Sequence, residues 1–407
     1  MGPVSNSRIH YMDNIRAFAM LLGVFFHASL AYSPLMSQVW MSASTDNASY
    51  IDFVAFYTHG WRMPLFFLVA GFFGALLYKK RGASAVIKNR SLRIVLPLII
   101  FLPLITIAVV TIFSWAAQSV SNPSPMLGLI TGMLNNPDAP KPPLSTMHLW
   151  FLYYLIWFYA LTLMFLFVYR KLNLKAIDWH TPVIKHPIVF LLLLPLVLVP
   201  SMLTQFSPLP APEQLSPALW AFGFHGVFFV LGWGIYNQPR VLDAIQPFMW
   251  PLLIIGLAYY IIYYSFMPSS FTIMDAMHNL TNSPDVDLNQ TIKASAEAYL
   301  SMYTVLAVLL VGKRFFDQQS QVAQFVSRSS YWVYIIHLPL VWILQFLLLD
   351  TDLPMLVEFA ISAFGTIAIG MLTYVLFISW SPIGWLLNGR QKSKSIDKPA
   401  LSPEKHG

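Results

Sequence analysis

The sequence contains no cysteine, which excludes disulfide bonds, thiolate nucleophiles and cysteine-ligated metal sites. Charge is also scarce, since Asp, Glu, Lys and Arg make up 10% of the 407 residues, against about 25% in an average soluble domain. Polar stretches long enough to fold on their own are lacking as well. Together these absences argue against a soluble protein of several domains.

What is present is apolar. Hydrophobic residues make up 57% of the chain, and they recur in runs of roughly 20 residues, the length that crosses a bilayer as a helix. The fold predicted is all-α and polytopic, with about ten transmembrane helices in one domain, residues 1–387, and a basic, disordered tail at 388–407. The spans are expected at Ile15–Met36, Phe53–Tyr78, Leu92–Ala117, His148–Tyr169, Pro187–Gln205, Pro217–Tyr236, Pro247–Met267, Ala294–Val311, Ser329–Leu349 and Pro354–Trp380.

The basic residues explain the net charge of +7 without a nucleic-acid partner. With the N-terminus placed in the cytoplasm, twenty of the 24 Lys and Arg residues lie on the cytoplasmic side, and only Lys141 and Lys293 lie outside. This asymmetry follows the positive-inside rule. The sequence therefore predicts an even number of spans, cytoplasmic N- and C-termini and a multi-pass protein of the plasma membrane.

Two ionisable residues interrupt the first span, Arg16 and His27. Eleven residues turn a helix by about 1100°, so the two side chains share one stripe, roughly 16 Å apart along the axis. Asp13 precedes Arg16 by three residues and can pair with it. An ionisable residue inside a span is a functional-site hypothesis by default. The alternatives are a snorkelling anchor for Arg16 and a hydrogen-bonded structural role for His27.

The second span carries His59 and Arg62, which are three residues apart and share a helical face. Because this span enters from outside, both are expected at roughly the depth of His27. Arg62 would then be a second buried cation near a possible base. The alternative is a structural pairing of Arg62 with backbone carbonyls or with a carboxylate such as Glu297 or Glu358.

Three further residues in or near the spans are candidates, His148 and Trp150 at the start of the fourth span and His337 in the ninth. Histidines beside Trp and Tyr at interfacial depth are often belt residues. Neither a His-x-x-x-His nor a Glu-x-x-His pair occurs on one predicted helix, so no metal site is predicted.

Five stretches resemble, in order, blocks of the membrane acyltransferase-3 family, and together they cover nearly the whole chain. They are Tyr11–Ala17 with its spacing to His27, Met63–Phe72, Arg90–Pro97, His148–Leu152 and Ser329–Pro339. Ala70 stands where the family often has Ser. Within the family, the chain looks most like the glucans biosynthesis protein C branch, which is associated with succinylation of osmoregulated periplasmic glucans.

The resemblance implies an acyl-CoA-dependent O-acyltransferase of a bacterial inner membrane, with no permanently bound cofactor. A succinyl or acetyl group would pass from cytoplasmic acyl-CoA to a hydroxyl of an extracytoplasmic carbohydrate, such as periplasmic glucan. Arg16 would bind the donor phosphates. His27 would act as general base or carry the acyl group transiently, and Arg62 would stabilise the oxyanion. Supporting positions are Asp13, His59, His148, Trp150 and His337.

Two other readings stay open. A transporter would move an anionic or glycan-linked substrate past Arg16 and Arg62, but it predicts internal repeats that the sequence does not show. Another membrane O-acyltransferase fold would also use an intramembrane His, but the short spacing from Arg16 to His27 favours the acyltransferase-3 family. The acyl group, the acceptor and the oligomeric state are not determined by the sequence.

Overall fold

The structure is a computed structural model. It describes residues 9–136, 138, 144–173, 175, 178–318 and 320–389. Every regular element in these ranges is a helix, apart from an isolated β-bridge between Ser145 and Gln214. Eight of the described helical segments are long and apolar enough to cross a membrane, which confirms the predicted all-α polytopic class. Of the predicted tail, Asn388 and Gly389 are described, and the remainder lies outside the described residues.

The helices that correspond to the predicted spans are mostly regular. Their bounds are α1 His10–Ser29, α2 Ser49–Arg90, α3 Leu96–Ser119, α5 Trp150–Lys171, α9 Leu219–Asn237, α11 Met249–Ser265, α13 Leu288–Phe315, α14 Gln321–Leu348 and α15 Met355–Thr373. The shorter helices are α4 Pro125–Leu134, α6 His180–Lys185, α7 Pro187–Leu193, α8 Val199–Met202, α10 Arg240–Ile245, α12 Ile273–Thr281 and α16 Pro382–Asn388. The predicted fifth span is broken into α7 and α8, because a 3₁₀ turn containing Pro195 separates them.

The segment between the second and third predicted spans, residues 79–91, is helical. α2 continues to Arg90, with one non-helical residue at Gly82, whose φ of +77° favours glycine. A π-helical turn at Ser91–Val95 then leads directly into α3. α2 and α3 therefore form one continuous helical segment of 71 residues. The segment reverses direction between the two helices, at one end of the bundle, and Arg90 and Arg93 belong to this bend.

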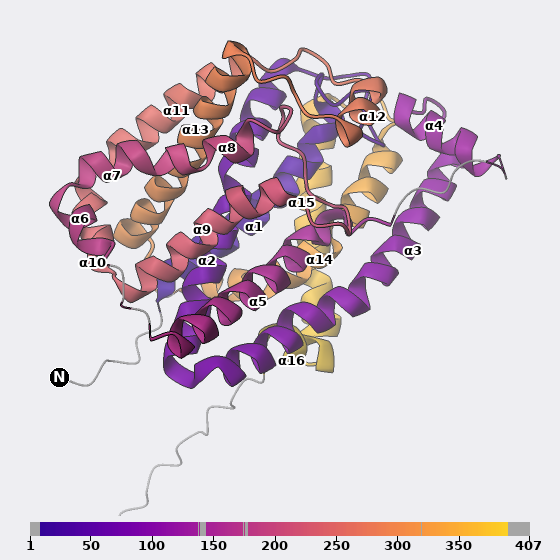
Figure 1. Ribbon diagram of the computed structural model, residues 1–407. Coiled ribbons are helices and arrows are strands. Elements are labelled where there is room, and N and C mark those ends of the chain that lie inside the picture. The colour runs from indigo at the N-terminus through magenta and orange to yellow at the C-terminus, as the bar shows by residue number, and fades with distance from the viewer. Residues whose placement is uncertain are drawn as a thin grey trace, which may run out of the picture.

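The long helices lie side by side, with α4 and α12 near one end of the bundle and α6, α10 and α16 near the other (Figure 1). α1 packs against α2, α13, α14 and α15. α13 is the most enclosed of the candidate spans, with 78% of its most apolar window buried. The helices that carry His27, Arg62 and His337 therefore meet in the interior of the protein.

Two glycines allow α2 and α9 to touch backbone to backbone. A Cβ added to Gly71 would lie 2.0 Å from the Phe229 carbonyl oxygen, and one added to Gly232 would lie 1.9 Å from that of Leu68. Small residues at such a crossing are typical of membrane helices, which associate by close packing rather than by a hydrophobic driving force. This contact fixes the part of α2 that follows Arg62.

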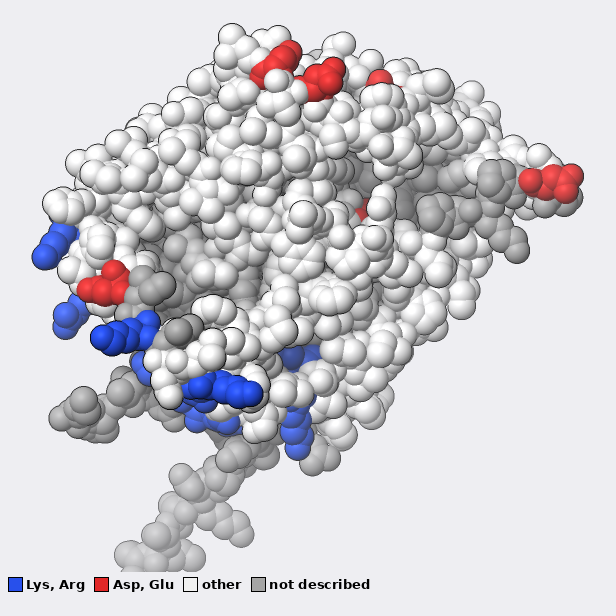
Figure 2. All heavy atoms as spheres, viewed as in Figure 1, with Lys and Arg blue, Asp and Glu red and all other residues white. Residues whose placement is uncertain are grey.

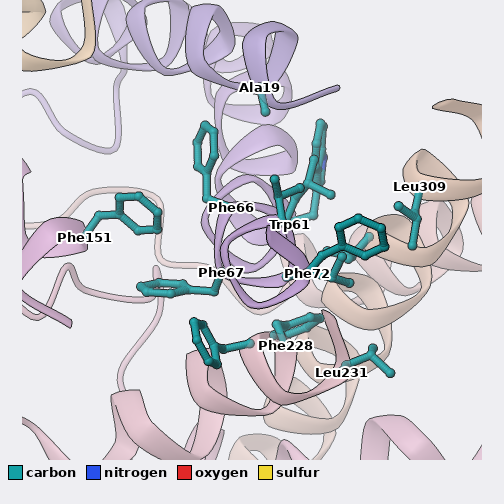
Figure 3. Packing of buried hydrophobic residues seen from close by; sticks show 14 of the residues in the cluster. Ala19, Trp61, Phe66, Phe67, Phe72, Phe151, Phe228, Leu231 and Leu309 are labelled. Carbon is teal, nitrogen blue, oxygen red and sulfur yellow. The ribbon is translucent and has the colours of Figure 1, made fainter. Parts of the chain in front are cut away.

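Aromatic side chains join α2 to α5 in the adjoining core. The centroid of the Phe151 ring lies 5.6 Å from that of Phe66 and 4.8 Å from that of Phe67. Figure 3 shows Phe151 of α5 facing these two residues of α2. All three side chains are buried. The start of α5 at Trp150, and with it the 3₁₀ turn Met147–Leu149 that carries His148, is thus held against α2.

Basic and acidic residues are distributed unevenly along the molecule. On the face that Figure 2 shows, Lys and Arg gather toward one end, with an acidic group among them, and the other acidic residues lie toward the opposite end. The basic end includes the second half of α2, with Lys79, Lys80 and Arg81. This is the pattern on which the predicted topology rests, and the assignment of the basic end to the cytoplasm stays a prediction.

The absence of native cysteine makes this topology directly testable. Ser84 and Ser283 are exposed at the two predicted sides. In intact cells, a membrane-impermeant maleimide is expected to label Ser283→Cys and not Ser84→Cys, and inverted vesicles should reverse the result. Labelling of Ser84→Cys from outside intact cells would contradict the predicted orientation.

Candidate active site

Three imidazoles lie in a row inside the bundle. The ring centroids of His27 and His337 are 5.1 Å apart, and those of His337 and His148 are 5.0 Å apart. His337 Nδ1 donates to the Tyr334 carbonyl at 2.7 Å, and His148 Nε2 donates to the Ile335 carbonyl at 2.9 Å. Each neutral ring therefore keeps its other nitrogen as an acceptor. The Nδ1 atom of His27 is buried without a hydrogen-bond partner among the described residues.

These imidazoles come from three distant parts of the chain. The sequence identified His27, His148 and His337 as separate candidates. Their spacing along the chain does not predict that the three side chains lie together. Nothing in their arrangement resembles a metal site: in the described part of the chain, no group of three or more His, Asp or Glu side chains is placed to hold an ion. The row of rings offers instead neighbouring proton acceptors in a closed environment.

Arg62 lies beside this row and is buried, with 4% of its surface exposed. Its guanidinium carbon lies 4.6 Å from the centre of the Phe26 ring, and its Nη1 lies 3.5 Å from the Leu22 carbonyl oxygen. The ion pairs found among the described residues do not include Arg62, so a pairing with Glu297 or Glu358 is not observed. The contact with the Leu22 carbonyl is the other structural pairing that the sequence left open. A guanidinium carries five N–H donors, and the Leu22 carbonyl is the one acceptor found for Arg62 among the described residues.

Two other predicted residues lie apart from the imidazole row. His59 Nε2 donates to the Leu209 carbonyl at 2.9 Å, and its ring stacks on Phe26 with centroids 4.8 Å apart. His59 thus ties α2 to the loop that precedes α9. Trp150 packs in the core with its ring 5.2 Å from that of His225. Both contacts are structural ones that hold α2, α5 and α9 together.

An aromatic side chain from the segment after α1 covers His27. The ring of Trp40 stacks on the imidazole, with centroids 6.0 Å apart and planes inclined by 22°. Gln345 holds it there: its Oε1 accepts from Trp40 Nε1 at 3.0 Å and from the Ser42 hydroxyl at 2.6 Å, and its Nε2 donates to the Ala28 carbonyl at 2.9 Å. Because Gln345 is 1% exposed, this connection is shielded from water.

The residues just before α5 are tied to the loop before α9, which fixes the position of His148. Both the N–H and the hydroxyl of Thr146 donate to the Glu213 carbonyl at 2.8 Å, and the Ser145 hydroxyl donates to the Glu213 carboxylate at 3.1 Å. Burial raises the pKa of this loop carboxyl, and the hydrogen bond from Ser145 acts in the opposite direction. The link lies at the end of the bundle opposite to the basic one.

A cavity of about 510 Å³ opens at the basic end, within the usual size range of small-molecule sites. Four arginines line it, and Asp13 is the single acidic lining residue in the described part of the chain. The arginines are Arg16 of α1, Arg90 at the end of α2, Arg93 of the π-helical turn and Arg328 of α14. We call this space the arginine cavity. Its excess of guanidinium groups suits an anion with several charges.

Arg16 holds a defined place at the wall of this cavity. Its Nη2 atom donates to the Ser327 hydroxyl at 3.2 Å and lies 3.4 Å from Asp13 Oδ1, as the spacing of three residues predicts. The cavity reaches Met20, one helical turn further along α1, and does not include His27. Seven more residues, about 10 Å of helix, separate Met20 from His27. Arg16 at the cavity and His27 in the imidazole row therefore mark two distinct sites along one helix.

Most of the residues that surround the two sites were not identified from the sequence. Arg90, Arg93 and Arg328 appeared only as topology signals, although Arg90 and Arg93 lie in a stretch that resembles a family block. Their convergence depends on the bend after α2 and on α14, which no local pattern reveals. Trp40 and Gln345 carried no signal, because the hydrogen bond between them joins residues over 300 positions apart.

The comparison with known families shows that the chain is an enzyme. Residues 9–375 match the family described as Acyltransferase domain (Acyl_transf_3). The chain belongs to the acyltransferase-3 family. The match includes Arg16, the three imidazoles of the row and Arg62. Together with the apolar helices, it makes the protein a multi-pass membrane acyltransferase.

Curated relatives match over a shorter part of the acyltransferase. Glucans biosynthesis protein C of Shigella dysenteriae serotype 1 (strain Sd197) is 35% identical over 107 residues, and that of Escherichia coli (strain K12) is 34% identical over 107 residues. Each match covers 26% of this chain and 27% of the relative, so about a quarter of their length is shared. No solved structure matches the chain.

The contact between Gln345 and Trp40 predicts a measurable change in local stability. Gln345→Ala removes three hydrogen bonds that fix the segment after α1, so backbone amides of residues 37–43 are expected to exchange with deuterium faster. Gln321→Ala, at an exposed position of the same helix, is the matched control. Equal exchange in the two variants would show that Gln345 does not hold Trp40 over His27.

Proposed function

We propose that this acyltransferase moves an acyl group, succinyl or acetyl, from cytoplasmic acyl-CoA to a hydroxyl of an extracytoplasmic carbohydrate. The observation that carries the proposal is the placement of two unlike sites on α1. The arginine cavity lies at the basic end of the bundle, and His27 lies further along the same helix. Such an arrangement joins a polyanion-binding site to a proton acceptor across a membrane protein.

The donor end of the proposal rests on charge and shape. CoA carries three phosphate groups and a narrow, largely uncharged pantetheine arm that ends in the thioester. Arg16, Arg90, Arg93 and Arg328 supply guanidinium groups that bind phosphate through paired N–H donors. With the phosphates in the arginine cavity, the arm extends along α1 toward His27, over the roughly 16 Å that separate Arg16 from that residue.

The transfer step assigns His27 as general base. The acceptor hydroxyl gives its proton to the imidazole while its oxygen attacks the thioester carbonyl carbon. The carbon–sulfur bond then breaks, the imidazolium returns the proton to the departing thiolate, and the products are an ester and CoA. We assign Arg62 the stabilisation of the oxyanion, because its guanidinium is buried beside the row and has one acceptor, the Leu22 carbonyl, among the described residues. A transient acyl-His27 is the covalent variant of this step.

His337 and His148 extend the proton path in this proposal. Their hydrogen bonds to backbone carbonyls fix the tautomers and leave one acceptor nitrogen on each ring. His337, whose ring is 5.1 Å from that of His27, is then the neighbour that shares or orients its proton. Asp13 acts at the other end, where it holds Arg16 at the cavity wall.

The acceptor is proposed from the relatives. The curated proteins that share a quarter of their length with this chain are named for glucan biosynthesis. We therefore infer a glucan on the outer side of a bacterial inner membrane as the acceptor. As the family resemblance implies, the proposed reaction uses no metal and no permanently bound cofactor. The transporter reading, in which a substrate passes Arg16 and Arg62 unchanged, predicts no CoA release.

Removal of the His27 imidazole tests the enzyme directly. Purified protein in lipid nanodiscs is given acetyl-CoA or succinyl-CoA with a soluble β-glucan, and free CoA is measured. His27→Ala is expected to lower kcat by about 10²- to 10⁴-fold, the usual contribution of a general base. His186→Ala, at an exposed histidine, should act as wild type. Full activity of a folded His27→Ala variant would contradict the role of His27, and no CoA release by wild type would favour the transporter.

Removal of cavity arginines tests the donor site. Arg16→Ala and Arg90→Ala should each raise KM for acyl-CoA roughly tenfold, because a charge-assisted contact with phosphate is lost. The difference from wild type should shrink at high salt. Arg240→Ala, at an exposed basic position away from the cavity, is the control. A KM that is unchanged in both cavity variants would place the donor elsewhere.

A further inference from the structure

We propose that the C-terminal helix α16 is part of the donor site, and that Asn388 and Gly389 are positioning residues for the arginines of the cavity. This inference rests on the proposed function, in which the cavity takes the phosphates of CoA. The family match ends at residue 375, and α16 begins at Pro382. The chain nevertheless returns to the cavity after that point, where Leu387, Asn388 and Gly389 line the wall.

Asn388 contacts two of the four arginine residues. Its side-chain Nδ2 donates to the Arg328 carbonyl at 3.0 Å and to the Tyr374 hydroxyl at 3.1 Å, and its own carbonyl accepts from Arg93 Nη2 at 3.1 Å. On the far side, the Tyr331 hydroxyl donates to the Arg93 carbonyl at 2.6 Å. The backbone of one arginine and the guanidinium of another are thus fixed through a single residue at the end of α16.

Gly389 gives the Arg93 guanidinium the space that it occupies. Its φ is +81°, a backbone conformation that residues with a side chain rarely adopt. A Cβ at this position would lie 2.1 Å from Arg93 Nη2. Any side chain would therefore both strain the turn and displace the guanidinium from the Asn388 carbonyl. The glycine is required by the close approach of the arginine as well as by the turn.

The end of α16 is itself firmly seated. Ser381 caps the helix by accepting a hydrogen bond from the Gly384 N–H. A Cβ on Gly384 would lie 2.0 Å from the carbonyl oxygen of Ile378, the last residue of the π-helical turn that follows α15. The helix therefore packs closely against the end of that turn. A helix held in this way can fix a flexible arginine.

Fixing the arginines before the ligand arrives has a direct effect on affinity. An arginine side chain loses rotamer freedom when it binds phosphate, and that cost falls when the side chain is already held. The bond to the Asn388 carbonyl uses one of the five N–H donors of Arg93 and leaves the others for an anion. Asn388→Ala keeps this carbonyl but removes the side-chain bonds to the Arg328 carbonyl and the Tyr374 hydroxyl, which hold the end of α16 in place. A side chain at position 389 displaces the Arg93 guanidinium itself. Both changes should therefore weaken donor binding and leave the chemical step at His27 unchanged.

The test uses the full chain in lipid nanodiscs, with Asn388→Ala, Gly389→Ala and the control Ile383→Ala on an outer position of α16. Binding of free CoA is measured by calorimetry, and KM and kcat for acyl-CoA are measured separately. Both variants should bind CoA about tenfold more weakly and raise KM to the same extent, with kcat kept. Ile383→Ala should match wild type. If Gly389→Ala does not fold, Asn388→Ala decides, since it only removes an amide.

The outcomes separate this inference from the proposed function. If wild type transfers the acyl group and both variants bind CoA as wild type does, the role of α16 is wrong and the enzyme stands. A lower kcat with unchanged KM would also overturn the inference, because it shows a general structural effect. If wild type binds CoA without transfer, the proposed function fails and the binding constants still decide on α16. If wild type binds no CoA, both are wrong.

Discussion

A charge inside a membrane protein must be solvated by the protein itself, and the interior of this acyltransferase is arranged around that requirement. Hydrocarbon offers no acceptor to a guanidinium, so Arg62 lies in the bundle interior, against the ring of Phe26 and the Leu22 carbonyl of the neighbouring helix. This contact requires α1 and α2 to pack closely. The same packing places His27, which follows Phe26, at the point where α14 brings in His337. The contacts that Arg62 requires thus determine how the helices that form the site pack together.

The two sites meet different physical demands. The arginine cavity is open and holds cations that water and ligand phosphates can solvate. His27 does not line that cavity and lies against the buried ring of His337 and the stacked ring of Trp40. A reactive thioester is protected from hydrolysis in such an enclosed place.

The sequence revealed the features that depend on local periodicity and on bilayer thickness. The all-α class, the spans and the stripe shared by Arg16 and His27 follow from these two quantities. The fifth span was less regular than predicted, because its prolines break the helix. The meeting of His148 and His337 with His27, and of Arg328 with the arginines after α2, depends on contacts between distant helices. Such contacts leave no periodic signal in one sequence.

The central claim is that donor and acceptor react from opposite sides of the membrane through α1. The most direct measurement uses inverted membrane vesicles with glucan trapped in the lumen and acyl-labelled acyl-CoA added outside. The account predicts that the label appears on the trapped glucan, that it requires His27, and that glucan added outside with the donor stays unlabelled. Label on the outside glucan alone, or release of CoA with no glucan labelled on either side, would contradict transfer across the membrane.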